Sequence, residues 1–503
     1  MNGSGQTTVL TGLCLLVSAC GLPDLERNVD YDAIFVEDRL VTWTISISDE
    51  DWQRVLVDQA AYVPVDVEVD GLLYEDVGLR LLGNKNRGKY SMRIRFNSFN
   101  PRRRFHGVKR VNLLNNAGDP SLVREALALD LMRRAGVAAP RSSFVRVSMG
   151  DRSGVYTLVE QVDNRFLEDR FGEDNGYLYK LERGGNLVFR GDEPERYNWL
   201  HTYELKSEVG VANHTALIHL MKILDRSSGD ELEQKLPEII DVDGLLLLLA
   251  INSWLSNMDS YPGVGGNLYL YQDSTGRFRF IPWNLNRAFG NYHGRHCKHA
   301  EGEEYCTEYS ARWCGENCQE LNPECYGLGG PGFCLQSMAE LCAEHHGEFC
   351  RWYVADCAKT PPEYCAYTTD ELIELDPQSP TCSADRPLVY KVLGVLSFRE
   401  RYREHLRTLV DGVLQPQAVE TRMEKMRALI AESAYQDIGK DCVTNDDFDA
   451  SFIADLSAEP LKDQPDLQLD PEEEPPEYRI PGLLPFTRAR DEVIRKALEG
   501  FRE

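Results

Sequence analysis

The sequence predicts an α+β fold, in which a β-rich first part is followed by a helical second part with a cysteine-rich insertion. Before residue 205, apolar and polar residues alternate along several short segments, as in strands with one buried face. After residue 206, apolar residues recur three and four positions apart, which is typical of helices. Eleven cysteines then fall within residues 297–382, where this periodicity is lost.

The first part carries the clearer strand signals. Segment 63–69 alternates throughout and is followed by Asp70-Gly71, a dipeptide that favours a tight turn. The same pattern predicts strands at 42–47, 77–82, 91–96, 144–148 and 155–162. A helix over 119–134 interrupts them, with Asp119 or Ser121 as its cap and Gly136 at its end. We therefore expect a mixed sheet packed on a helix.

The second part is predicted to be helical around one hairpin. Helices are expected at 212–224 and at 244–255, the latter capped by Asp243 and leading into a loop with Asp259. A hairpin turning at 273–276 follows, and its aromatic residues are expected in the core: Tyr269, Tyr271, Phe278, Phe280 and Trp283. Helical patterns resume at 388–414, 417–432 and 485–501. Segment 446–478 has twelve acidic residues and one lysine, and we expect a solvated, flexible loop there.

Charge restricts the classes of partner. The 503 residues carry a formal net charge of −26, which argues against nucleic-acid binding. Residues 80–110 are an exception, because they contain eleven Lys or Arg and no acidic residue. An anion is the natural partner of this segment.

The N-terminus predicts export. An apolar run over 9–19 ends in Leu-Val-Ser-Ala before Cys20, which resembles the processing site of a bacterial lipoprotein. We therefore expect a signal peptide at 1–19, a lipid anchor on Cys20 that holds the exported protein at the cell-envelope membrane, and a linker at 20–40. The first eight residues carry no positive charge, which departs from a usual signal.

The other cysteines agree with export. Twelve lie beyond the signal, an even number that predicts disulfides in an exported chain. Since eleven fall within the insertion 297–382, we expect Cys442 to bridge back to it. Zinc is the alternative, supported by His293, His296 and His299 beside Cys297. No CxxC pair is present, so disulfides are preferred.

Segment 257–290 has the order of residues that phosphoryl transfer requires. Asp259 lies in a loop, Asn267 follows, and Asn284-Leu285-Asn286 comes after the hairpin. In such sites a carboxylate orients the attacking hydroxyl and accepts its proton, while oxygen ligands hold a metal ion against the nucleotide phosphates.

Several motifs, in this order, resemble the CotH (spore coat protein H) family of secreted atypical protein kinases. The resemblance covers roughly residues 60–295 and, more weakly, 385–500, and rests on RLLGN at 80–84, KYSMRIRF at 89–96, LLNN at 113–116, GVY at 154–156, EQVD at 160–163 and segment 257–290. The usual family motif ends in PWDxD, whereas this chain has Asn284 and Asn286 at the two Asp positions.

The resemblance implies a two-lobe, kinase-like fold that binds ATP with Mg²⁺ or Mn²⁺. The small lobe would span 41–205, and the large lobe 206–296 and 383–503 around the disulfide-rich insertion 297–382. Asp259 would be the catalytic carboxylate, and Asn267, Asn284 and Asn286 the metal ligands. Lys89, near Gly83, would contact phosphate, with Lys85 and Arg93 as alternatives; Glu125 would position the lysine, and Glu160 would lie at the hinge near the base.

Three functions follow as hypotheses. The first is a kinase that transfers the ATP γ-phosphoryl group to Ser or Thr of an envelope or coat protein. The second is a pseudokinase that binds or assembles surface proteins, because an amide in place of a carboxylate weakens metal binding by roughly a few kcal/mol. The third is an adhesin whose cysteine-rich segment does the binding.

Overall fold

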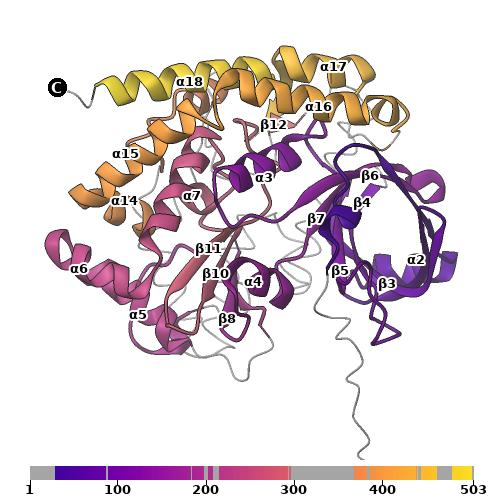
Figure 1. Ribbon diagram of the computed structural model, residues 1–503, viewed down its shortest axis with the longest axis horizontal. Helices are drawn as coiled ribbons and strands as arrows, with labels where there is room; N and C mark the ends of the chain where they lie inside the picture. The colour runs from indigo at the N-terminus through magenta and orange to yellow at the C-terminus, as the bar shows by residue number, and fades with distance from the viewer. Residues whose placement is uncertain are drawn as a thin grey trace, which may run out of the picture.

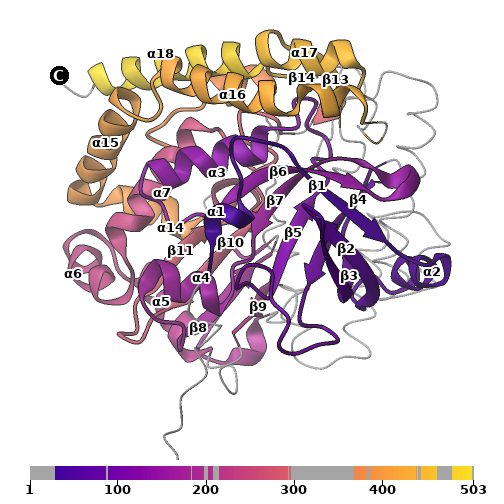
Figure 2. The same cartoon turned by 45° about the vertical axis from the view of Figure 1, so that its right-hand side comes forward.

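The computed structural model describes residues 29–86, 89–182, 184–197, 202–207, 214–292, 294–295, 368–381, 386–437, 439, 443–460 and 478–500. The fold is mixed α+β: a closed barrel, a second sheet, and helices that pack around that sheet (Figures 1 and 2). The predicted signal, Cys20, Cys442 and all eleven cysteines of the insertion lie outside the described residues.

Seven strands in the order β1-β2-β3-β4-β5-β7-β6 close the barrel. The closing pair, β1 with β6, is parallel and sets Val41 opposite Val145, whereas the other pairs are antiparallel. The strands are β1 (Val41–Ser46), β2 (Val63–Val69), β3 (Leu72–Asn86), β4 (Lys89–Arg95), β5 (Arg110–Leu114), β6 (Ser142–Ser148) and β7 (Gly154–Glu160). Short helices α1 (Tyr31–Ile34) and α2 (Asp49–Val57) precede β1 and β2.

The sequence pattern explains the barrel. Alternate residues of β1 and β2 are buried in its interior, where Trp43, Phe96 and Phe105 pack their rings together. Asp70 and Gly71 both have positive φ, as a two-residue hairpin turn requires. The expected turn and the bounds of β2 are confirmed.

The second part contains a four-stranded sheet of order β11-β10-β8-β9 and a three-stranded sheet of order β12-β13-β14. Its strands are β8 (Tyr177–Leu181), β9 (Tyr203–Leu205), β10 (Leu268–Gln272), β11 (Phe278–Pro282), β12 (Gly294–Arg295), β13 (Leu456–Pro460) and β14 (Tyr478–Ile480). Its helices are α4 (Asn164–Phe171), α5 (Thr215–Arg226), α6 (Gly229–Ile239), α7 (Val242–Trp254), α8 (Tyr261–Val264), α13 (Thr369–Ile373), α14 (Pro387–Gly394), α15 (Leu396–Asp411), α16 (Pro416–Tyr435), α17 (Asn445–Ile453) and α18 (Leu483–Glu499). Helix α3 (Arg124–Arg134) lies between β5 and β6 in the chain and packs against β6 and α16, and 3₁₀ turns lie at Gly150–Arg152 and Pro194–Arg196.

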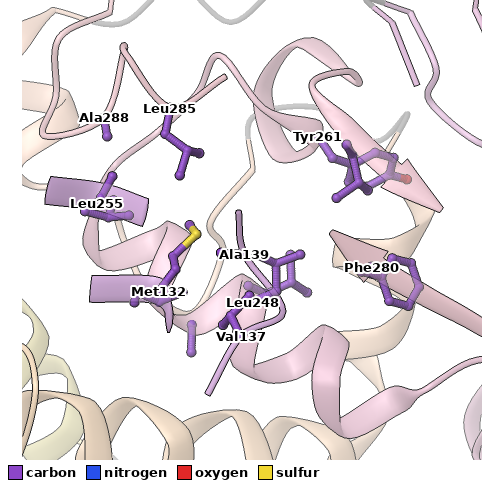
Figure 3. Close-up of a cluster of buried hydrophobic side chains, with 14 of the residues drawn as sticks. Met132, Val137, Ala139, Leu248, Leu255, Tyr261, Phe280, Leu285 and Ala288 are labelled. Atoms are coloured by element: carbon purple, nitrogen blue, oxygen red, sulfur yellow. The ribbon is translucent and has the colours of Figure 1, made fainter. Parts of the chain in front are cut away.

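Helix α7 is the centre of the larger core. It is apolar around its whole circumference and packs against β11, α15 and α18. Figure 3 shows residues from α3, α7 and β11 in one cluster, with Leu285 and Ala288 over Leu255 and Met132. The loop after β11 is therefore anchored in the core by its apolar residues.

The structure corrects several sequence predictions. Asp241, not Asp243, caps α7, because its side chain accepts a hydrogen bond from Gly244 N; Asp243 is instead in the first turn. Helix α3 begins only at Arg124, after a turn in which Asp119 accepts from Arg124 N. Within 446–478, α17 and β13 are ordered, since Thr444 caps the helix and β14 pairs with β13. The long pattern at 388–414 is divided at Val395 into two helices.

The aromatic residues of the hairpin lie where the sequence predicts. Tyr269, Tyr271, Phe278 and Phe280 are buried, and Trp283 packs on the core while remaining half-buried. Within the ranges given above, none of the helices combines the length and the hydropathy that a membrane crossing requires.

Candidate functional site

The loops before β10 and after β11 meet at one place. Asn267 Nδ2 donates to the carbonyl oxygen of Asp259 at 2.6 Å, and Asn284 Nδ2 lies 3.4 Å from Asn267 Oδ1. The backbone N–H of Trp283 donates to Asn267 O at 3.2 Å. The structure thus brings Asp259, Asn267 and Asn284 together at one end of the β10–β11 hairpin.

Both asparagines have a backbone conformation that few residue types accept. The φ angle is +52° at Asn267 and +57° at Asn284, in the left-handed region where Asn and Asp are tolerated best. Ser256 and Phe289 in the adjoining loops also have positive φ. Such strain concentrates at sites whose geometry is held by the surrounding structure.

Glu125, near the start of α3, lies at the same loops. It is 2% exposed, and the backbone at Leu285 and Asn286 lies close enough to its carboxyl group to oppose part of the rise in its pKa. Its Oε2 atom has no hydrogen-bond partner among the described residues. Burial, together with the nearby charges of Asp119 and Asp259, raises the pKa of Glu125 to about 8.

The loop that carries Asn286 is also tied to the turn before α3. Asn286 Nδ2 lies 3.4 Å from Ala117 O, and Asn291 Nδ2 donates to Gly118 O at 2.9 Å. The Oδ1 atoms of both asparagines are buried, and neither has a partner among the described residues. Asn286 and Asn291 therefore join the loop after β11 to the turn before α3.

The raised pKa of Glu125 predicts a loss of stability with increasing pH. The folded protein binds this proton more tightly than the unfolded chain, whose glutamate has a pKa of 4.5. The contribution of Glu125 to the free energy of unfolding is therefore fully present below about pH 4.5. It is lost as the pH rises toward about 8, by up to ~1.4 kcal/mol per pH unit. Glu125→Gln removes this titration, so we expect it to be more stable than the unaltered protein at about pH 8 and similar at about pH 4.5.

Thermal unfolding of both proteins across this pH range, with a chelator present, measures the effect. Asp119 and Asp259 are the titratable groups that face Glu125, and both are retained in the variant. Parallel stability curves for the two proteins over the whole range would contradict a proton on buried Glu125.

Lys89 does not have the surroundings of a phosphate-contacting lysine. Its side chain is 1% exposed, and Nζ donates to Asp437 Oδ2 at 2.7 Å and to Val155 O at 2.6 Å. The ammonium also lies 4.7 Å from the centroid of the Tyr156 ring. A side chain at Gly154 would meet the Asp437 carboxylate, which explains the glycine there. Lys89 joins the barrel to the end of α16, and Glu125 does not pair with it.

Arg93, which the sequence allows as an alternative, is better placed. Its Nε donates to Asn112 Oδ1 at 2.8 Å, and its terminal nitrogens have no partner among the described residues. It interacts electrostatically with Tyr269, two residues after Asn267, and with Arg80, its cross-strand neighbour. Burial and the nearby Arg80 lower the pKa of Arg93. Neither Arg93 nor Arg80 has a carboxylate partner in the described part of the chain.

Glu160 is held at the end of β7. Arg141 Nη1 donates to Glu160 Oε1 at 2.8 Å, and Arg170 Nη2 lies 3.1 Å from Oε2. Burial raises the pKa of Glu160 against the opposing effect of these arginines. Glu160 and Gln161 line a cavity of about 180 Å³ beside α4.

Gly83 lies in the irregular part of β3, between two stretches of regular pairing with β4.

Sequence inspection missed three residues of this region. Gln161 accepts from Asn112 at 3.3 Å and contacts Tyr269, so it joins the cavity to Arg93. Tyr269 was expected only as a core residue, and Asp437 carried no local signal. Gln161 belongs to the quoted motif EQVD, which was the available signal for it.

A metal ion at this site would depend on amide as well as carboxylate oxygens. Among the described residues, no three His, Cys, Asp or Glu side chains gather as a ligand group. Asp259 and Glu125 are two carboxylates, and Asn267, Asn284 and Asn286 add amide oxygens, which hard cations such as Mg²⁺ accept. The residues present therefore fit a weakly held divalent cation.

Comparison with known proteins gives two matches. Residues 79–320 match the family model described as CotH kinase protein. Inner spore coat protein H of Bacillus subtilis (strain 168) is 30% identical over 202 residues, which are 39% of this chain and 55% of that protein. The match thus spans about half the length of this curated relative. Both matches bear out the family resemblance that the sequence motifs indicate.

Proposed function

Residues 79–320 belong to the CotH kinase protein family, and from this premise we propose that the protein is an atypical kinase of a coat or envelope. It transfers the γ-phosphoryl group of ATP to Ser or Thr of a protein partner. The observation that carries the proposal is the meeting of Asp259, Asn267 and Asn284. Arg93, which interacts with Tyr269 two residues after Asn267, supports it as a cation that has no acidic partner among the described residues. The coat setting comes from the name of the relative.

In this proposal the barrel and the α7-centred part act as the two lobes of a kinase. The nucleotide base enters the cavity beside Glu160 and Gln161, where the end of β7 leads from the barrel into α4. Gln161 connects this cavity through Asn112 to Arg93. Arg93 and Arg80 then contact the phosphates, in place of Lys89, because guanidinium groups suit phosphate oxygens.

The helical part supplies the reacting groups. Asp259 orients the acceptor hydroxyl and takes its proton as the phosphoryl group is transferred. Asn267 and Asn284 hold Mg²⁺ or Mn²⁺ through their amide oxygens, and the ion neutralises charge on the phosphates. Asn at position 284 in place of the family Asp removes a negative charge, which lowers the affinity for the ion and with it the rate.

Binding and transfer are tested together. We expect calorimetric titration with ATP and Mn²⁺ to show binding that Arg93→Met weakens at least about tenfold, because a charge-assisted phosphate contact is lost. We expect Asp259→Asn to keep ATP binding and to abolish phosphate incorporation into an acidic protein substrate.

Arg102→Met is the matched control for binding, because Arg102 is exposed on the loop between β4 and β5. It removes the same charge and should leave ATP affinity unchanged. Absence of ATP binding in the unaltered protein, with and without Mn²⁺, would reject the kinase and the nucleotide site together.

The two asparagines favour a second candidate, a catalytically inactive pseudokinase that binds or assembles surface proteins. Asn284 and Asn286 stand where the family has metal-binding carboxylates. ATP binding without any phosphate transfer, unchanged by Mn²⁺, would select this candidate.

Export and a lipid anchor at Cys20 are a further part of the proposal. Labelling with a radioactive fatty acid tests the anchor, and Cys20→Ala is the control.

A further inference from the structure

Two buried arginines hold the backbone at both ends of the loop that carries Asp259. Arg490, from α18, is 0% exposed, and its Nη2 atom donates to Ser253 O at 3.0 Å in the last turn of α7. Arg386, directly before α14, is 5% exposed, and its Nε atom donates to Gly263 O at 3.2 Å in α8. Its Nη2 atom donates to the same oxygen. Asp259 lies between these two carbonyl groups in the chain.

The surroundings of Arg490 indicate a specific use of its charge. It forms no ion pair with a carboxylate in the described ranges; instead, Nη1 donates to Ile373 O at 2.6 Å and to Leu375 O at 2.8 Å. A buried guanidinium group without a counter-ion is costly, because it has lost its contacts with water. The end of α7 offsets part of this cost, since the C-terminus of a helix carries partial negative charge. Arg490 thus fastens the end of α7 to α18 and to the end of α13.

The segment that follows α13 also packs on this loop. Leu372 and Leu375 belong to one apolar cluster with Met258 and Val264, and Met258 directly precedes Asp259. Leu372, Leu375, Arg386 and Arg490 all lie beyond the stretch that matches the CotH kinase family. The later part of the chain therefore supports the loop from several sides.

The backbone of the loop is of a kind that needs such support. The φ angle is +44° at Ser256, and a side chain at Gly263 would meet Met258 O. Strained backbone persists only where the surrounding structure holds it in place. Because the carbonyl oxygen of Asp259 accepts from Asn267 at 2.6 Å, a shift of the loop would also disturb this contact.

We propose that Arg386 and Arg490 are positioning residues for phosphoryl transfer, which hold the Asp259 loop in the conformation that directs its carboxylate to the acceptor hydroxyl. Both act through the backbone of the loop and not on the nucleotide or the acceptor. The inference rests on the proposed function for the role of Asp259. A displacement of a reacting group by about 1 Å can lower a rate about 100-fold, so loss of either arginine affects transfer without a contact to substrate.

Hydrogen–deuterium exchange of the full chain tests whether the loop depends on the arginines. Arg386→Met and Arg490→Met keep an apolar stem and remove the donors. We expect the backbone amides of residues 254–265 to exchange at least about tenfold faster in each variant, while those of β2 in the barrel keep their rates. Arg490→Lys keeps the charge with a shorter donor, and it takes the place of Arg490→Met in this comparison if the latter does not fold.

Arg495→Met is the control, because Arg495 lies on the same helix but donates to Asp411 and to Val410 O, away from the loop. Its loop amides should exchange as in the unaltered protein. Unchanged exchange of the loop in the Arg386 and Arg490 variants would overturn the inference. Equal acceleration in the loop and in β2 would also overturn it, because that is the sign of a general loss of stability.

Phosphate incorporation gives the second readout. We expect kcat to fall at least about tenfold in both arginine variants and the KM for ATP to stay within about threefold, because the proposed nucleotide site lies on the barrel. An unchanged kcat despite faster exchange of the loop would overturn the positioning role. If the unaltered protein transfers no phosphate, the kinase itself is rejected, whereas the exchange rates still decide whether the arginines hold the loop.

Discussion

Replacing Lys89 by Met is expected to destabilise the protein by about 3–5 kcal/mol, because it leaves the buried carboxylate of Asp437 without its counter-ion. Lys89 and Asp437 are 1% and 0% exposed, and their atoms lie 2.7 Å apart. Met has nearly the shape of Lys, so the loss comes from the charge and not from a cavity. Denaturant unfolding followed by fluorescence measures the difference in the free energy of unfolding.

A second variant separates the ion pair from other effects. Lys89→Met/Asp437→Asn removes both charges, but the N–H groups of Val155 and Gly439 donate to different oxygens of Asp437, so the single Asn oxygen can accept from only one of them. We expect the double variant to recover part of the lost stability, because no buried charge is left unpaired. Lys222→Met is the control, since its partner Asp192 is 60% exposed and such surface pairs contribute about 0–1 kcal/mol.

This experiment also decides the role of Lys89. A lysine that contacted phosphate would, when replaced, lower ATP affinity without a large loss of stability. Stability close to that of the unaltered protein, combined with a loss of ATP binding, would contradict the ion pair and return Lys89 to the nucleotide site.

Asn284→Asp is expected to increase the affinity for Mn²⁺ in the presence of ATP by at least about tenfold, or about 1.4 kcal/mol. The variant restores a carboxylate beside Asn267, where the proposed function places the ion. Asp tolerates the left-handed backbone of this position, where φ is +57°, so the change should not disturb the loop. Calorimetric titration of Mn²⁺ into the ATP-saturated protein measures the affinity, and phosphate incorporation measures any gain in activity.

Asn100→Asp adds the same charge on an exposed loop and controls for the overall field of the protein. Its Mn²⁺ affinity should remain that of the unaltered protein. If Asn284→Asp binds Mn²⁺ no more tightly than this control, position 284 does not face the ion.

Local patterns were sufficient for many elements. Strand β2 and the turn at Asp70-Gly71 follow from alternation and from residues that accept positive φ. The β10–β11 hairpin likewise brought Asn267 and Asn284 into one region, because a short hairpin places its two ends side by side. The site was thus predictable where its residues lie close in sequence or at the two ends of one hairpin.

Residues whose partners lie far away in the sequence were not predictable. Lys89 was expected to bind phosphate because of its basic neighbours, yet its partner Asp437 is 348 positions away. Glu125 was expected to position that lysine, yet it contacts the backbone at Leu285 and Asn286. The segment 446–478 was expected to be a loop because of its acidity, although capping and strand pairing order its first part.

The amino-acid sequence by itself determined the α+β class, the family and the loops that carry Asp259, Asn267 and Asn284, because these depend on periodicity and on short motifs. Only the tertiary structure decided that β1 and β6 close a barrel, that Lys89 is neutralised by Asp437, and that Glu125 lies beside Asn286. The physical reason is that a buried charge must find a partner in space, and the packing of distant segments chooses which one.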